Sequence, residues 1–360
     1  MSASTTSAPA SASETATAEK VPVTVLTGYL GAGKTTLLNR ILSEPHGKKY
    51  AVIVNEFGEI GIDNDLVVGA DEEVFEMNNG CICCTVRGDL VRILDGLMRR
   101  KGKFDAIIVE TTGLADPAPV AQTFFMDENV GRKTRLDAVV TVADAMWLKD
   151  RLVDAPEAKN QIAFADVILI NKTDLVSADD LAEVEGRIRG INPYAKVHRT
   201  QRAQIPLSEV LGRNAFDLDR ILELEPEFLD GDGHDEGHDH DHDHHHSHHH
   251  HHHHGGLKHY HDEEMQSLSL KTDKPLDPDK FFPWVQNLVQ TEGPNILRSK
   301  GILSFKDDDE RFVFQGVHMI LDGDHQRPWN AGEPRTSRIV FIGRNLPEQQ
   351  IRQGFASCVA

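Results

Sequence analysis

The residues best suited to chemistry in this chain of 360 residues lie near its beginning, in a glycine-rich segment. An apolar run typical of a strand, 21–27, precedes it, and apolar residues at helical spacing follow. In such a loop, backbone N–H groups point at phosphate oxygens, a lysine reaches the outer phosphates and a hydroxyl holds Mg²⁺. The expected phosphate-binding residues are Gly28, Gly31, Ala32, Gly33, Lys34, Thr35 and Thr36, with Thr35 on Mg²⁺. The sequence therefore predicts a nucleoside triphosphate site.

A second segment indicates which base is bound. The apolar run 165–170 is followed by Asn171, Lys172 and Asp174, at the strand end where doubly wound sheets bind ligands. A carboxylate such as Asp174 can accept from the N1–H and 2-amino groups of guanine, whereas adenine offers no such pair. A site built for polar groups can reject an analogue lacking them by on the order of 10⁴-fold. We therefore expect GTP rather than ATP, with Asn171 meeting the other edge of the base and bracing the loop.

Acidic residues at two further strand ends are candidates for catalysis. The strand 105–110 ends in Glu110, three residues before Gly113, where P-loop proteins sense the γ-phosphate. Glu110 replaces the usual aspartate, which points to an unusual branch of GTPases. After the strand 50–54, Glu56 and Glu59 could position Mg²⁺ or the attacking water, although each could equally be part of a solvated turn. The catalytic candidates are thus Lys34, Glu56, Glu59 and Glu110.

Three of the four cysteines, Cys81, Cys83 and Cys84, fall within four residues. In an extended segment the side chains at 81 and 83 project to one side, so their thiolates could grip one soft cation and leave its coordination open. A disulfide between such close cysteines would be strained. Buried, inert cysteines are the alternative. Cys358 stands alone and is interpreted as a packing residue or free thiol.

A histidine-rich tract runs from His234 to His254. It cannot bury a core, so we expect it to be disordered, and its imidazoles alternate with carboxylates as in a loose chelator of transition metals. A solvated linker is the alternative. The first candidate ligands in the tract are His234, His238, His240, His242 and His244. The isolated His318 and His325 are interpreted as packing or surface residues.

Taken together, these motifs resemble the CobW family of GTP-binding metallochaperones, and the resemblance runs from Val21 to the end. The segments that carry it are 28–37, 55–59, 80–84, 110–117 and 171–174. The resemblance implies a GTPase that binds Zn²⁺ or Co²⁺ through Cys81, Cys83 and Cys84, at a site linked to the nucleotide. It also implies delivery of the metal to a client metalloprotein. Two other functions stay open, a GTPase component of cobalamin synthesis and a metal buffer built on the histidine tract.

Composition limits the partners. The formal net charge of −19 argues against nonspecific nucleic-acid binding, and no apolar run approaches the length of a membrane span. The first twenty residues lack the features of a signal peptide, so we expect a cytoplasmic protein. A homo-oligomer is compatible with the sequence.

The chain divides into four predicted parts. These are a disordered tail at 1–20, a P-loop GTPase domain at 21–228, the histidine-rich linker at 229–264 and a CobW-type α+β domain at 265–360. Strands alternate with helices in the GTPase domain, which predicts a doubly wound, mostly parallel sheet. Its other expected strands are 73–77, 137–143 and 195–198, and its expected helices include 87–100, 157–163 and 178–190. In the last domain we expect strands at 268–271, 301–305, 311–321 and 338–342 and a helix at 280–290.

Overall fold

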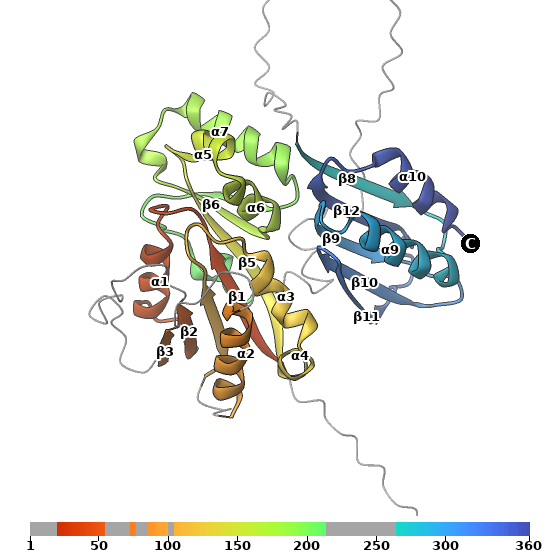
Figure 1. Ribbon diagram of the computed structural model, residues 1–360, viewed down its shortest axis with the longest axis horizontal. Helices are drawn as coiled ribbons and strands as arrows, with labels where there is room; N and C mark the ends of the chain where they lie inside the picture. The colour runs from red at the N-terminus through yellow and green to blue at the C-terminus, as the bar shows by residue number, and fades with distance from the viewer. Residues whose placement is uncertain (1–19, 55–72, 77–84, 100–103, 214–263) are drawn as a thin grey trace, which may run out of the picture.

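A computed structural model describes residues 20–54, 73–76, 85–99, 104–213 and 264–360. The described residues form a first unit, up to residue 213, and a second unit, from residue 264, each built on its own sheet (Figure 1). No helix within these ranges is long and apolar enough to cross a membrane.

The first unit contains a seven-stranded sheet with the order β3-β2-β4-β1-β5-β6-β7, and all its pairings are parallel. Its strands are β1 (Val21–Thr27), β2 (Tyr50–Val54), β3 (Glu73–Glu76), β4 (Ala106–Glu110), β5 (Thr134–Asp144), β6 (Val167–Asn171) and β7 (Lys196–Arg199). The helices are α1 (Lys34–Ser43), α2 (Thr85–Met98), α3 (Ala118–Met126), α4 (Glu128–Lys133), α5 (Leu148–Asp154), α6 (Pro156–Phe164) and α7 (Ala178–Ile191), with 3₁₀ turns η2 (Thr173–Leu175) and η3 (Leu207–Glu209). This confirms the predicted doubly wound α/β fold.

Alternating residues of the central strand β1 explain the two helical layers. Val23 and Val25 join one buried cluster with residues of α2, α3, α6 and α7, whereas Leu26 joins a second cluster with Leu37 and Ile41 of α1. Because side chains alternate across a strand, a strand that is apolar on both faces must be covered on both. Because helices cover both faces of the sheet, we expect the binding site in the loops at the carboxyl ends of the strands.

The second unit is a five-stranded antiparallel sheet with the order β11-β10-β9-β12-β8. Its elements are β8 (Met265–Thr272), α9 (Pro278–Glu292), β9 (Ile296–Leu303), β10 (Glu310–Val317), β11 (Ile320–Pro328), β12 (Ser337–Arg344) and α10 (Glu348–Ser357). The helices α9 and α10 share a core with one face of the sheet, through side chains such as Phe281, Phe355 and Phe341. The predicted α+β class is confirmed.

The other face of the second sheet packs on the first unit. Ile302, Val313 and Val340 belong to the same buried cluster as Phe164 and Val184 of the first unit. Helix α6 contacts β9, and α3 contacts β10 and β11, as their arrangement in Figure 1 also shows. A continuous apolar core therefore joins the two units.

One predicted strand is wrong. We expected a single strand over 311–321, but the structure divides it into β10 and β11, which pair as a hairpin. The chain reverses at His318, which adopts a left-handed conformation with φ of 52°. The apolar run continues on both sides of the reversal, so periodicity gave no sign of the turn.

Candidate functional site

The glycine-rich segment forms the turn between β1 and α1. Gly28 has φ of 136°, and a Cβ there would lie 2.1 Å from the Val142 carbonyl oxygen. Gly33 has φ of 115°, and a Cβ there would lie 2.5 Å from Nδ2 of Asn171. Both positions therefore require glycine, for conformation and for space. The loop that results is a cradle of backbone at the N-terminus of a helix, which suits phosphate.

Lys34 is the cation of this loop. Its side chain is buried, and Nζ donates to the carbonyl oxygens of Gly28, at 2.6 Å, and Tyr29, at 3.3 Å. Burial lowers the pKa of Lys34, and the negative charge of Glu110 opposes this effect. Thr35 and Thr36 follow on the first turn of α1, where both are exposed. A buried ammonium beside exposed hydroxyls at a glycine-rich turn fits the phosphates of a nucleotide and an associated Mg²⁺.

Asn171 ties the base segment to the phosphate loop. Its Nδ2 donates to the carbonyl oxygen of Ala32 at 2.9 Å. Its Oδ1 accepts from the backbone N–H of Ala203 at 2.8 Å and from the Thr200 hydroxyl at 3.2 Å. Asp174 lies exposed on η2, where it could meet a base. The three loops after β1, β6 and β7 thus converge on one side chain.

Lys172 is fixed by a residue that the sequence did not reveal. It has φ of 61°, and its Nζ donates to Oδ2 of Asp144 at 2.6 Å. The other oxygen of Asp144 accepts from the backbone N–H of Met146 at 2.9 Å. Asp144 lies beside Asn171 in the sheet. Asp144 is the last residue of β5, and residues 200–203 follow β7 at the same edge, so the strand-end rule that found Asp174 could have found them too.

The segment after β4 lies against the phosphate loop. Glu110 is buried, and the N–H of Thr111 donates to the Leu26 carbonyl oxygen at 2.9 Å. Gly113 is so close to the loop that a Cβ on it would lie 2.6 Å from the backbone nitrogen of Leu30. The two segments are therefore packed so closely that a shift of the phosphate loop would displace Gly113, and a shift of Gly113 would displace the loop.

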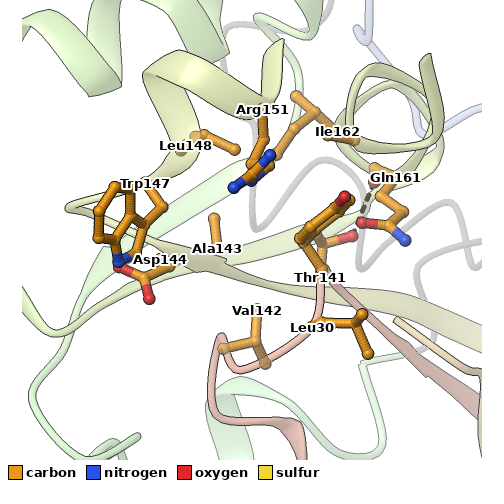
Figure 2. A pocket seen from close by; sticks show the side chains of 12 residues that line it. Leu30, Thr141, Val142, Ala143, Asp144, Trp147, Leu148, Arg151, Gln161 and Ile162 are labelled. Carbon is orange, nitrogen blue, oxygen red and sulfur yellow. Dashed lines mark hydrogen bonds between the residues drawn. The ribbon is translucent and has the colours of Figure 1, made fainter. Parts of the chain in front are cut away.

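A cavity of about 460 Å³ opens beside the phosphate loop (Figure 2). Trp147 and Arg151 reach it from the region of α5, and Leu30 lines its opposite side. The Arg151 guanidinium lies 5.3 Å from the centroid of the Tyr29 ring. Lys34 and Asp174 do not line this cavity, so it adjoins the expected nucleotide site rather than containing it.

Several predicted residues lie outside the described part of the chain. They are Glu56, Glu59, Cys81, Cys83, Cys84, His234, His238, His240, His242 and His244. Within the described ranges, no group of three or more His, Cys, Asp or Glu residues could hold a metal ion. Cys358 is buried, and burial raises the pKa of its thiol, as expected of a packing residue. His325 is bonded to Asp308, at 2.8 Å.

Strand β3, which precedes the cysteine segment, ends close to the site. It stops at Glu76, which pairs with Val54 of β2, and Val54 pairs in turn with Glu110. Helix α2 begins at Thr85. Strand β3 therefore ends at the same edge of the sheet as Glu110.

Comparison with known proteins gives concordant matches. The family model of the CobW/HypB/UreG nucleotide-binding domain matches residues 22–199, and that of the cobalamin synthesis protein cobW C-terminal domain matches residues 265–359. The chain is 34% identical to the zinc chaperone YjiA of Escherichia coli over 344 residues, which cover 93% of this chain and 98% of that protein. It is also 34% identical to the zinc-regulated GTPase metalloprotein activator 1 of Schizosaccharomyces pombe, covering 92% of this chain and 84% of that protein.

A solved structure matches over both units. The crystal structure of Zn(II)-bound YjiA GTPase from E. coli superposes with a TM-score of 0.70 at 30% identity, covering 95% of this chain and 100% of that one. The likeness extends beyond the nucleotide-binding unit to the antiparallel sheet that follows it.

Proposed function

The chain belongs to the CobW family, and from that premise we propose that it is a GTP-hydrolysing metallochaperone. It binds Zn²⁺ or Co²⁺ through Cys81, Cys83 and Cys84 and delivers the ion to a client metalloprotein. Zinc is the better supported cargo, because the relatives in E. coli and S. pombe are named for zinc.

The observation that carries the nucleotide part is the bond between Asn171 and the Ala32 carbonyl oxygen. It joins a segment suited to guanine to a loop suited to phosphates. Lys34 and Glu110 lie at the same edge. These contacts support a single GTP bound across the phosphate loop and the base segment.

Hydrolysis needs charge to be neutralised on the β and γ phosphates. The Lys34 ammonium would exchange its two carbonyl partners, Gly28 and Tyr29, for phosphate oxygens. Thr35, with Glu110 nearby, would hold Mg²⁺, which when bound neutralises phosphate charge. Gly113 lies where its N–H could approach the γ-phosphate, because it already touches Leu30. The described residues thus account for binding and charge neutralisation, and the attacking water is left to Glu56 or Glu59.

Coupling between GTP and metal is supported by where strand β3 ends. Glu76 and Glu110 both pair with Val54, so the strand that precedes the cysteines in the sequence ends at the same edge as Glu110. GTP would order the loops into a geometry that holds the metal, and hydrolysis would release it. By linkage, the ratio of metal affinities in the GTP and GDP forms equals the factor by which metal changes their relative affinities.

The decisive experiment is a competition titration of Zn²⁺ with a chromophoric chelator, in GTP, GDP and no nucleotide. The protein should lack 234–254, because a high-capacity imidazole tract would mask one tight site. We expect a difference of about 5- to 150-fold between nucleotide states. Triple substitution of Cys81, Cys83 and Cys84 by serine should remove this difference and leave GTP binding intact.

A pair of lysine variants tests whether the measured GTP hydrolysis occurs at this site. Lys34→Ala should abolish hydrolysis, whereas Lys133→Ala, at an exposed ion pair with Asp95, should not.

Equal Zn²⁺ affinity in all nucleotide states would contradict the nucleotide-dependent metal switch and favour the metal buffer. The cobalamin alternative rests on the cobW name of the second family model, and Co²⁺ titrated in parallel addresses it.

A further inference from the structure

Two adjacent side chains of α6 hold the segment that follows Glu110. Gln161 donates from Nε2 to the carbonyl oxygens of Gly113, at 3.1 Å, and Ala115, at 3.2 Å. Asn160 donates from Nδ2 to Oδ2 of Asp116 at 2.8 Å. Helix α6 therefore holds the segment 113–116 both by its backbone carbonyl groups and by the side chain of Asp116.

Arg344 of the second unit contacts Asn160, one of these two α6 side chains. Arg344, the last residue of β12, donates from Nη2 to Oδ1 of Asn160 at 2.5 Å. Asn160 is 8% exposed. Both ends of its amide are thus bonded, one to the second unit and one to Asp116. The bond from Arg344 is partly buried, and a hydrogen bond from a charged group is among the stronger kinds.

Asp116 also bonds to the start of helix α3. Its Oδ1 accepts from the N–H of Ala118 at 2.9 Å, at the start of α3, and α3 packs against β10 and β11. His318 lies in the turn between those strands, where the charges of Asp116 and Arg344 act on it. Burial lowers the pKa of His318, which keeps it neutral near pH 7, while the charge of Asp116 opposes that effect. Arg344 therefore supplies a permanent positive charge at this junction.

A separate anchor holds the two units together. Arg298 and Lys300 of β9 bond to the buried Asp166, which immediately precedes β6 and so lies at the opposite ends of the strands from the phosphate loop. The units can thus stay packed when Arg344 is altered, which allows its effect on the nucleotide site to be measured alone.

We propose that Arg344 is a positioning residue for GTP hydrolysis, acting through Asn160 on Asp116 and so on the position of Gly113. The proposal rests on the GTPase function proposed above. Gly113 contacts Leu30 in the phosphate loop, so a segment that loosens at Asp116 loses its fixed distance to the γ-phosphate. The second unit is then a part of the catalytic cycle and not only a cover for the sheet.

Steady-state hydrolysis of GTP by the full chain tests this proposal. Arg344→Gln and Asn160→Ala should each lower kcat on the order of 10-fold, because each removes a hydrogen bond of about the strength that this factor requires. The affinity for GDP, which lacks the γ-phosphate, should change less than about twofold. The double variant should be no slower than the slower single one, because both changes break the same path. Arg344→Lys, which keeps a donor and the charge, should restore part of the rate.

Two controls distinguish positioning from simple packing. Arg335→Gln breaks an ion pair of 2.6 Å with Asp309 inside the second unit, and Lys300→Gln weakens the anchor at Asp166. Neither should lower kcat as Arg344→Gln does. If the wild type hydrolyses GTP while Arg344→Gln and Asn160→Ala match it, or if their effects simply multiply, the positioning role is wrong. If the wild type does not hydrolyse GTP, the proposed function fails first.

Discussion

The Nδ2 of Asn171 donates to the carbonyl oxygen of Ala32 while its Oδ1 accepts from the N–H of Ala203. Asn171 itself is 2% exposed, so none of these bonds is shared with bulk water. The shape of the phosphate loop therefore depends on the base segment before any nucleotide binds.

Replacing Asn171 by alanine should destabilise the nucleotide-free protein. The change leaves the Ala32 carbonyl oxygen and the Ala203 N–H without a partner, at a cost of about 2 kcal/mol or more in the free energy of unfolding. Urea unfolding without nucleotide measures it. The matched control is Asn295→Ala, because Asn295 is exposed and its side-chain amide donates to Glu292, at 3.1 Å. Equal stability losses in the two variants would contradict the bracing role.

Adding one methyl group at Gly113 should slow hydrolysis without unfolding the protein. A Cβ there would lie 2.6 Å from the backbone nitrogen of Leu30, so the segment or the phosphate loop must shift. Misplacements of about 1 Å near reacting groups can cost on the order of 10²-fold in rate. We expect Gly113→Ala to lower kcat at least 10-fold, measured by phosphate release.

The control for Gly113 is a glycine with space around it. Gly96 lies in α2, is exposed, and a Cβ there would meet nothing within 4 Å. Gly96→Ala should keep the hydrolysis rate and stabilise the protein by roughly 0.5–1 kcal/mol, because alanine favours a helix over glycine. A Gly113→Ala variant with wild-type kcat would show that the contact with Leu30 has no part in turnover.

Asp174→Asn should change the preferred base. Asparagine cannot accept from both the N1–H and the 2-amino group of guanine, but its amide can donate to the 2-oxo group of xanthine. GTP affinity should fall by on the order of 10²-fold or more, while XTP affinity rises. Fluorescent-nucleotide titration measures both. Asp179→Asn, an exposed change in the first turn of α7, should leave the preference for GTP unaltered.

Some of the residues around Asn171 could be predicted from the sequence, and others could not. Gly28, Lys34 and Asp174 could be found because each sits in a short motif next to an apolar strand. Asp144 carries no motif, although it ends strand β5 at the same edge and accepts a hydrogen bond from Lys172. The parallel pairings could be expected from the alternation of strands and helices, since that pattern buries both faces of the sheet. The order of the strands was not predicted, because the alternation alone does not determine it.

Long-range contacts had no local signature. Arg344 and Asn160 are 184 residues apart, and neither residue type nor spacing links them. The hairpin turn at His318 was also missed, because a non-glycine residue adopts the left-handed conformation there. In both cases the packing of the two units decides the outcome, and packing is not written in any one segment.

Asp166 anchors the second unit to the first. Oδ1 of Asp166 accepts from Arg298, at 2.7 Å, and from Lys300, and Oδ2 accepts from the N–H of Val139, at 2.8 Å. Burial raises the pKa of Asp166, but the charges of Arg298 and Lys300 outweigh it, so that pKa lies below its usual value. A lowered folded-state pKa means that the ionised carboxylate stabilises the fold above the ordinary value of about 4.

Stability contributed by Asp166 should therefore be constant from about pH 5 to 8 and be lost as pH falls through its lowered pKa. Asp166→Asn should remove about 3 kcal/mol of unfolding free energy at pH 7, because it leaves the Arg298 guanidinium buried without its counter-charge. It should also flatten the acid limb of the stability curve, followed by urea unfolding from pH 7 to pH 3. The control is Asp309→Asn, whose exposed pair with Arg335 should contribute little at any pH. An Asp166→Asn variant as stable as the wild type at pH 7 would show that the apolar contacts alone hold the units together.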